Sequence, residues 1–263
     1  MKVDDIDLDA SYYQDHSQPQ YERAQEFLKS LNLAESASVL DVGCGHGNII
    51  AEISQKAPKG KSIGLDASSD MIRLAREKFL NSKFPNLEFQ HAKAEEMSFM
   101  NDCFDVITCF SCLLWVREPK KALDLMCKSL KPGGILLILT YLKESAYITF
   151  LEKTLEEFSS YKKLSAVHTM LSIEEYKDIL RSQKFELDEF RPEWRLSKYK
   201  NTEELKTYIR GWLTCYVPLP EELQESFLNK AVEKSLTVSI SSRKDEIVLP
   251  YQVLAIKARK PID

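Results

Sequence analysis

The chain has 263 residues, of which 44% are hydrophobic, and it carries a formal net charge of −4 at pH 7. This length and composition suffice for one large α/β domain, or for a core domain with a cap. The acidic balance, without a dominant basic region, argues against nonspecific binding to nucleic acid. Residues 1–20 lack the apolar stretch of a signal peptide, and no apolar run approaches the roughly 18 residues of a membrane span. We therefore expect a cytoplasmic protein whose partner is neither a membrane nor a nucleic acid.

Strand and helix patterns alternate between residues 37 and 140. The first strand, at 38–42, runs into a glycine-rich turn, and the nearly continuous apolar run at 104–110 is typical of a central parallel strand. Lys131-Pro-Gly-Gly134 is expected to end a helix and to turn into the next strand. Further strands are predicted at 61–66, 86–90 and 135–139, and helices at 49–56, 68–79 and 119–130. This alternation favours right-handed crossovers and a doubly wound parallel sheet.

The residues after 140 have a different pattern. Helices are predicted over 141–183, where Ser172 and Glu175 form a capping box, and over 201–238, with a break at Pro218-Leu-Pro220. Two more strands are predicted at 185–196 and 246–257, the last of them antiparallel. We predict an α/β fold, Rossmann-like and doubly wound, in which a seven-stranded, mostly parallel sheet carries a helical substrate cap. A single domain, 1–263, has its core at about 30–140, 172–196 and 246–260, and its cap or lid at 1–30, 141–171 and 197–245.

The cysteines give no sign of a metal site. Among the six of them, Cys109 and Cys112 form a C-x-x-C pair. A zinc site would need a second pair or nearby histidines at suitable spacing, and the sequence offers neither. Because Cys109 lies in an apolar strand pattern, we interpret the pair as buried, reduced thiols of the core and expect no metal.

The most informative segment is Asp41-Val-Gly-Cys-Gly-His-Gly47, which follows the first predicted strand. Glycines at this point allow a tight turn and the close approach of a ligand to the N-terminus of the next helix. The spacing differs from the dinucleotide fingerprint, because Asn48 stands where that pattern requires glycine. No Gly-Lys-Ser/Thr follows, so the segment is not a phosphate-binding loop either. Asp41 suits a cationic amino group better than a pyrophosphate.

This segment resembles motif I of the class I S-adenosylmethionine (SAM) methyltransferases. Asp66 ends the second strand, where the resemblance implies an acid that accepts hydrogen bonds from the ribose hydroxyls. Lys93 departs from the family pattern. At this position the family usually has an acid that accepts a hydrogen bond from the adenine amino group. SAM, with S-adenosylhomocysteine as its product, is therefore the expected cofactor. The expected cofactor-binding residues are Asp41, Gly43, Cys44, Gly45, Gly47, Asp66, Ala67, Met71, Ala94, Glu95 and Ser111.

Segments outside the cofactor motifs resemble the trans-aconitate and juvenile-hormone-acid methyltransferase group. The resemblance rests on Tyr13, Gln20-Tyr-Glu-Arg-Ala24, Leu113-Leu-Trp115, Arg210-Gly-Trp-Leu213 and the segment from Tyr251 to Lys260. That group usually has histidine where this chain has Leu114, so the leucine removes a hydrogen-bonding group near the sulfonium.

Several residues are candidates for the substrate side of the site. Gln20 and Trp115 are taken over from the group resemblance. His168 is a candidate base, and Arg195, Arg210 and Tyr216 are candidates to anchor an anionic substrate. The alternative for each of these residues is that it has no functional role, since such residues are also common on the surface or in the core.

The expected reaction is methyl transfer from SAM to a small molecule, with a carboxylate as the leading acceptor. A carboxylate is ionised at pH 7 and needs no general base, which agrees with a sequence without a Cys-His or Ser-His-Asp signature. The alternatives are methylation of a phenol, an amine, carbon or a carrier-bound acyl group, or a SAM-binding module without catalysis. The sequence does not predict the oligomeric state.

Overall fold

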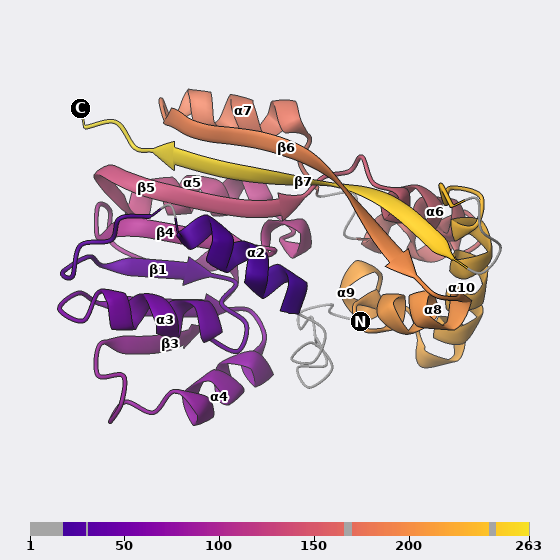
Figure 1. Ribbon diagram of the computed structural model, residues 1–263, viewed down its shortest axis with the longest axis horizontal. Coiled ribbons are helices and arrows are strands. Elements are labelled where there is room, and N and C mark those ends of the chain that lie inside the picture. Colours follow the sequence, from indigo (N-terminus) through magenta and orange to yellow (C-terminus); the bar gives the residue numbers. More distant parts are fainter. Residues whose placement is uncertain (1–17, 30, 166–169, 242–245, 263) are drawn as a thin grey trace.

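The computed structural model describes residues 18–29, 31–165, 170–241 and 246–262. Within these residues, seven strands form one sheet (Figure 1). The strands are β1 (Val39–Val42), β2 (Ser62–Asp66), β3 (Leu87–His91), β4 (Phe104–Phe110), β5 (Leu130–Tyr141), β6 (Glu186–Tyr199) and β7 (Ile247–Arg259). Their order is β3-β2-β1-β4-β5-β7-β6, and β7 runs antiparallel to both of its neighbours while the other pairs are parallel. The predicted Rossmann-like α/β fold with a mostly parallel seven-stranded sheet is confirmed.

The helices alternate with the strands up to β5, and five further described α-helices, α6 to α10, follow β5. The described α-helices are α2 (Gln18–Leu28), α3 (Asn48–Lys56), α4 (Ser69–Lys78), α5 (Pro119–Ser129), α6 (Ala146–Leu155), α7 (Ile173–Ser182), α8 (Thr202–Arg210), α9 (Leu213–Tyr216) and α10 (Glu221–Ser235), and the short 3₁₀ helices are η1 (Ala94–Glu96), η2 (Leu113–Trp115) and η3 (Ser159–Leu164). The capping box predicted at Ser172 and Glu175 is present at the start of α7.

Helices cover both faces of the sheet, because the central strands have apolar side chains on both faces. All four residues of β1 are buried: Val39 packs toward α2, α3 and α4, whereas Leu40 packs toward α5 and α7. Figure 1 shows α2 and α3 in front of the sheet, with α5 and α7 on its other side. This arrangement is the three-layered, doubly wound architecture that the alternating pattern predicts.

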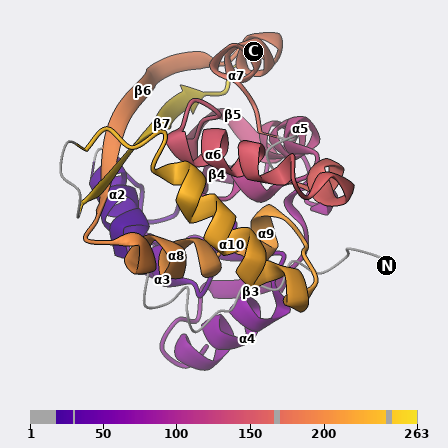
Figure 2. The ribbon, with the colours of Figure 1, turned by 90° about the vertical axis from the view of Figure 1, so that its right-hand side faces the viewer.

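A separate hydrophobic cluster holds the cap together. It joins α6, α8, α9 and α10 to the far ends of β6 and β7, which extend beyond the rest of the sheet (Figures 1 and 2). Phe150 of α6 and Phe227 of α10 are fully buried in this cluster. Because β6 and β7 take part in both the sheet and the cap, the cap is built on the same strands as the core.

Two boundaries differ from the sequence prediction. The described part of 1–30 was expected in the cap, but α2 packs on the sheet, since Ala24, Phe27 and Leu28 form an apolar face that is buried against the core. The turn predicted at 131–134 lies inside β5, whose pairing with β4 already begins at Leu130. Gly133, with φ near +75°, allows the chain to bend there without leaving the sheet.

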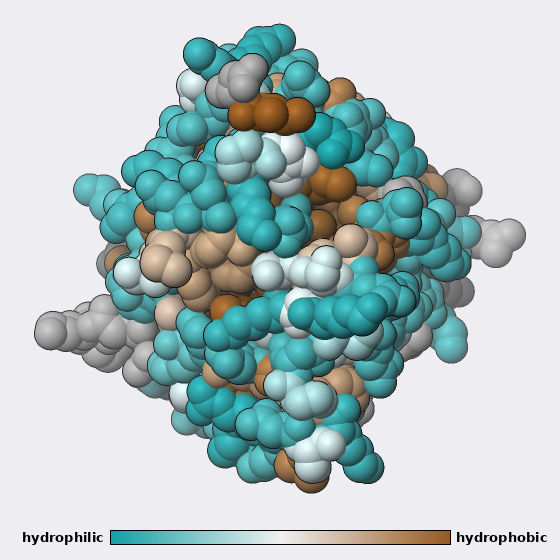
Figure 3. Space-filling view, turned by 90° about the vertical axis from the view of Figure 1, so that its left-hand side faces the viewer, coloured by the Kyte–Doolittle hydropathy of each residue, from teal (hydrophilic) through white to brown (hydrophobic). Residues whose placement is uncertain are grey.

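The end of the molecule opposite the cap is largely hydrophilic, with small and scattered hydrophobic areas (Figure 3). The amino ends of the parallel strands lie at this end, so the carboxyl ends of those strands face the cap. Among the described helices, none is both long and apolar enough to cross a lipid bilayer.

Candidate active site

The strand order reverses at β1, which has β2 on one side and β4 on the other. In open α/β sheets, ligands bind at such a switch point, beyond the carboxyl ends of the strands. A cavity lies there between the ends of β2 and β4, the glycine turn, η1 and η2. Its described lining consists of Gly43, Gly45, Leu65, Asp66, Ala67, Ser68, Met71, Lys93, Ala94, Glu95, Phe110, Ser111, Cys112, Trp115, Val116 and Arg117.

Two of the glycines fit this cavity for different reasons. At Gly43, with φ near +75°, a Cβ atom would lie 2.4 Å from Cβ of Cys112, so no larger residue fits beside the end of β4. Gly45 lines the cavity, and a Cβ atom at this position would have no protein atom within 4 Å. A larger residue at position 45 would therefore take up open space beside the cavity wall. Gly47 lies at the start of α3, and it faces Phe89 rather than the cavity. Of the three predicted glycines, Gly43 and Gly45 therefore line the cavity and Gly47 supports the turn.

Asp66, at the carboxyl end of β2, organises this wall of the cavity. Its Oδ2 accepts a hydrogen bond from the backbone N–H of Gly45 at 2.8 Å, and its Oδ1 accepts one from Ser68 at 2.9 Å. Burial raises the pKa of Asp66, and these two backbone hydrogen bonds act in the opposite direction. A carboxylate in this position has further lone pairs with which to accept hydrogen bonds from ligand hydroxyl groups.

Asp41 is buried in the middle of the sheet and is not among the residues that line the cavity. Its Oδ1 accepts a hydrogen bond from the Thr108 hydroxyl at 2.7 Å. Burial raises its pKa to about 7, and the nearby charge of Asp66 adds to this rise. Asp41 is therefore a carboxyl group whose charge state changes near neutral pH. Cys44 is likewise buried and outside the described lining.

Another part of the lining is formed by η1. Ala94 and Glu95 are both buried and line the cavity. Lys93 also lines it, although its ammonium group lies 3.9 Å from Glu96 in a partly exposed ion pair. The lysine that departs from the family pattern thus lies at the predicted site.

The residues after β4 complete the cavity beside the cap. Ser111 has a positive φ of 55°, which is uncommon for a residue other than glycine, and its N–H donates to the Leu139 carbonyl at 2.7 Å. Cys109 is fully buried as predicted, whereas Cys112 packs against the same hydrophobic core but is only half-buried and also lines the cavity. Hydrogen bonding with Cys109 and burial raise the pKa of Cys112, which keeps this thiol protonated.

The predicted substrate-side residues have different outcomes. Trp115 lines the cavity. Arg210 and Arg195 instead lie on the surface in ion pairs, the former 2.9 Å from Glu225 and the latter with Glu193, because their helix and strand positions face solvent. Tyr216 is buried within the cap, where burial raises its pKa. Gln20 belongs to α2, but its side chain lies outside the described part of the structure, and so does the whole of His168.

Several lining residues were not predicted. They are Leu65, Ser68, Phe110, Cys112, Val116 and Arg117, besides Lys93, whose unusual position the sequence did reveal. Phe110 ends the predicted central strand at 104–110 and Cys112 follows two residues later, so a predicted strand order with this strand beside the first would have indicated them.

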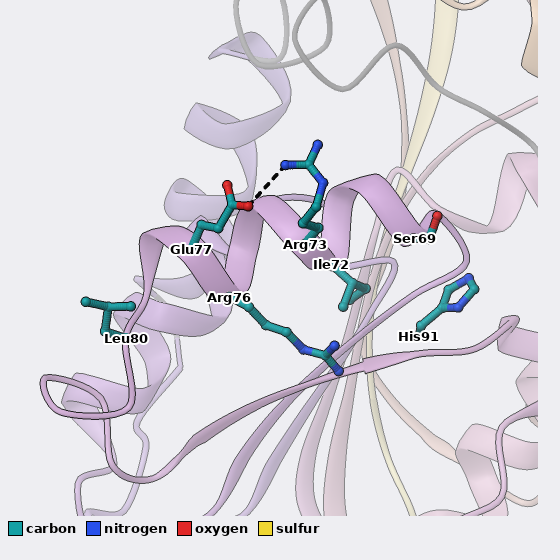
Figure 4. A pocket seen from close by; sticks show the side chains of 7 residues that line it. All are labelled: Ser69, Ile72, Arg73, Arg76, Glu77, Leu80 and His91. Carbon is teal, nitrogen blue, oxygen red and sulfur yellow. Dashed lines mark hydrogen bonds and ion pairs between the residues drawn. The ribbon is translucent and has the colours of Figure 1, made fainter.

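A second depression lies on the outer side of α4 and has a structural explanation (Figure 4). The guanidinium of Arg76 donates to the carbonyl of Phe89 at 2.7 Å and so covers the edge strand β3. Arg73 pairs with Glu77 at 3.2 Å within the same helix. These charged groups stabilise the helix and the sheet edge, and we assign no ligand to them.

A family model described as a methyltransferase domain matches residues 33–192, which is more than half of the chain. The chain belongs to this family, as the glycine motif and Asp66 predict. Residues 33–192 include the whole described lining of the cavity.

Individual relatives differ in the group that they methylate. The chain is 24% identical to juvenile hormone acid O-methyltransferase of Drosophila melanogaster, over 95% of this chain and 92% of that protein. It is 40% identical to the ubiquinone/menaquinone biosynthesis C-methyltransferase UbiE of Vibrio vulnificus, over 40% of this chain and 41% of that protein. The chain spans about half the length, or less, of the first curated relatives that it matches.

Solved structures share the fold. The YcgJ protein of Bacillus subtilis superposes with a TM-score of 0.66 at 18% identity, over 92% of this chain and 99% of that one. Phospholethanolamine N-methyltransferase 2 of Haemonchus contortus superposes with a TM-score of 0.56 at 18% identity, over 92% of this chain and 53% of that one. The latter structure contains S-adenosylhomocysteine, so a neighbour of the same fold binds the product of SAM.

Proposed function

We propose that the cavity binds SAM and that the protein transfers its methyl group to a carboxylate of a small molecule. The observation that carries this proposal is the convergence of the glycine turn, the Asp66 carboxylate and η1 at the switch point of the sheet. Membership of a methyltransferase family supports the same reading. Because the relatives include both O- and C-methyltransferases, the proposal of a carboxylate acceptor rests on the chemistry of the site.

The residues present fit the cofactor. The open space beside Gly45 allows a ligand to approach the backbone, and Asp66 has acceptor capacity for the two ribose hydroxyls. Ala67, Met71 and Ala94 offer an apolar surface to the adenine ring. When bound, SAM supplies an electrophilic methyl group on a sulfonium centre.

The residues near Trp115 favour an acceptor that is already ionised. Among the described residues that line the cavity there is no histidine, and Cys112 is a protonated thiol with a raised pKa. Lys93 and Arg117 bring two positive charges to a lining that also has the carboxyl groups of Asp66 and Glu95, and Arg117 follows Trp115 by two residues, where a cation would attract an anion. A carboxylate needs only to be positioned and desolvated, because its reaction with a sulfonium neutralises both charges.

Calorimetry and product analysis test the proposal. We expect SAM and S-adenosylhomocysteine to bind, and a panel of carboxylic acids, phenols and amines to yield a methylated acid that mild base hydrolyses. A base-stable product would favour transfer to an amine or to carbon. Binding of SAM without turnover of any acceptor would favour the non-catalytic module, which the departures at Lys93 and Leu114 allow. No binding of either cofactor form would exclude both readings.

A further inference from the structure

Five tyrosines from five elements meet where the cap joins the sheet. This tyrosine cluster consists of Tyr141 (β5), Tyr147 (α6), Tyr199 (β6), Tyr208 (α8) and Tyr251 (β7). Neighbouring ring centroids are 5.8 Å apart for Tyr141 and Tyr251, 6.0 Å for Tyr147 and Tyr208, and 5.5 Å for Tyr199 and Tyr208. Each of these hydroxyl groups needs a hydrogen-bond partner where it is buried.

Helix α2 adds a guanidinium group to the cluster. Nη2 of Arg23 donates a hydrogen bond to the Tyr141 hydroxyl at 2.8 Å, and its Cζ lies 5.4 Å from the centroid of that ring. Burial lowers the pKa of Arg23, and the hydrogen bond with Tyr141 is among the interactions that act in the opposite direction and leave this pKa raised. A half-buried, permanently charged group therefore lies against Tyr141 of the cluster.

The hydroxyl groups of the cluster are not equivalent. Those of Tyr147 and Tyr199 hydrogen-bond to each other. Those of Tyr208 and Tyr251 have no hydrogen-bond partner among the described residues. Burial raises the pKa of Tyr208 well above its usual value, so this side chain is a neutral phenol with a proton to donate. A guanidinium and neutral phenol O–H groups are all donors, and together they match an oxyanion.

An aromatic wall connects the cluster to the cofactor cavity. Trp115 lines the cavity, and the centroid of its ring lies 6.3 Å from that of Trp212. Trp212 in turn lies 6.0 Å from Tyr208 and 6.4 Å from Tyr147. Its indole N–H is buried and has no hydrogen-bond partner among the described residues. A continuous series of ring contacts therefore runs from Trp115, at the cavity, through Trp212 to Tyr208 of the cluster.

We propose that Arg23, Tyr208 and Tyr251 form an anion-binding subsite that holds the end of the acceptor remote from the methyl group. This inference rests on the proposed methyltransferase function and specifies its substrate class. The acceptor carries one reactive group near Trp115, an apolar middle along Trp212 and a second oxyanion, a carboxylate or a phosphate. The anion held by Arg23 is not the methylated one, because a guanidinium that engages both oxygens of a carboxylate lowers their nucleophilicity.

Calorimetry on the protein saturated with S-adenosylhomocysteine tests the subsite. The probes are linear dicarboxylic acids from hexanedioic to dodecanedioic acid, their monomethyl esters, and the matching ω-phosphonooxy carboxylic acids. We expect at least one dianion to bind about tenfold or more tightly than its monoester, as expected for a charge-assisted hydrogen bond. A stronger preference for the phosphonooxy probe would identify phosphate as the recognised group, and a preference for the dicarboxylate would identify a second carboxylate.

Variants assign the effect to the named residues. Arg23→Gln should abolish the preference for dianions, and Tyr208→Phe and Tyr251→Phe should each reduce it about threefold to tenfold. The matched controls are Arg195→Gln, an exposed arginine on β6, and Tyr161→Phe in η3, outside the cluster. Binding of S-adenosylhomocysteine verifies that each variant is folded, and Arg23→Lys should retain part of the preference.

The outcomes separate this inference from the proposed function. If S-adenosylhomocysteine binds but the wild-type protein shows no preference for a dianion, or binds none of the probes, the subsite is refuted and the cofactor site stands. A preference that survives Arg23→Gln also refutes it. If S-adenosylhomocysteine itself does not bind, the proposed function fails and the subsite fails with it.

Discussion

The hydroxyl of Thr108 on β4 donates a hydrogen bond of 2.7 Å to Oδ1 of Asp41 on β1. The two residues face each other across a parallel strand pair at the centre of the sheet. This bond favours the ionised carboxylate, yet burial outweighs it and raises the pKa of Asp41 to about 7. The carboxyl group that begins the glycine motif therefore exchanges a proton near neutral pH in the ligand-free protein.

Asp41→Asn should change the dependence of stability on pH. The unfolded pKa is about 3.9 and the folded pKa is higher, so the folded state binds more protons between these values. The stabilisation from this group is complete below the unfolded pKa and is lost as pH rises through about 7. An asparagine has no such loss. The Tm of the variant, measured without ligand, should therefore rise relative to wild type as pH increases. Asp70→Asn, an exposed change on α4, is the control, and parallel Tm curves for Asp41→Asn and wild type would contradict the prediction.

Asp66→Asn should weaken binding of S-adenosylhomocysteine by about tenfold to a hundredfold, which corresponds to the loss of a hydrogen bond to a charged acceptor. An amide presents an N–H where the carboxylate accepts from Gly45 or Ser68, and it has less acceptor capacity for ribose hydroxyls. Calorimetry gives the dissociation constant, and the Tm shows whether the turn stays folded. Asp70→Asn should bind like wild type. An unchanged dissociation constant for Asp66→Asn would remove this residue from the site.

Gly43→Ala should cost more stability than Gly133→Ala, although both glycines have φ near +75°. Backbone strain is common to both changes and costs about 1 kcal/mol. Only at position 43 does the new Cβ lie 2.4 Å from Cβ of Cys112, whereas at position 133 its nearest neighbour is 3.7 Å away. Overpacking of this kind costs about a further 1–3 kcal/mol. Urea denaturation of the two variants measures the difference.

A second substitution shows whether the contact with Cys112 is the cause. Because the clash involves Cβ of Cys112, Cys112→Gly should recover part of the loss in Gly43→Ala, and Cys112→Ala should recover less. The same stability loss in Gly43→Ala and Gly133→Ala would mean that the glycine is required for its backbone angles alone.

Local patterns predicted many of the residues that line the cavity. The glycine turn, Asp66 and the capping box at Ser172 each depend on a few consecutive residues, so spacing alone reveals them. The fold class follows in the same way, because alternating apolar strands and amphipathic helices leave few ways to bury their faces.

Contacts between distant segments could not be predicted in this way. Cys112 meets Gly43 only because β4 pairs with β1, and Arg23 meets Tyr141 only because α2 packs on the sheet rather than in the cap. Arg195 and Arg210 were plausible anion-binding residues by type, but the register of β6 and the exposed face of α8 turn them to solvent. The substrate side is therefore the part of the site for which tertiary packing, not sequence pattern, decides which residues meet.

Alkylation of Cys112 should report occupancy of the cavity. The contact with Cys109 and burial raise the pKa of Cys112, so its reaction with iodoacetamide should be slow at neutral pH and should become faster as the pH rises. S-adenosylhomocysteine should slow this reaction, because Cys112 lines the cavity beside Gly43. Cys103, which is half-buried just before β4 and outside the described lining, should react at the same rate with and without the ligand. Peptide mapping by mass spectrometry measures both rates in one sample. If the ligand protects both thiols equally, the effect is a general tightening of the fold; if it protects neither while it is bound, the ligand does not occupy this cavity.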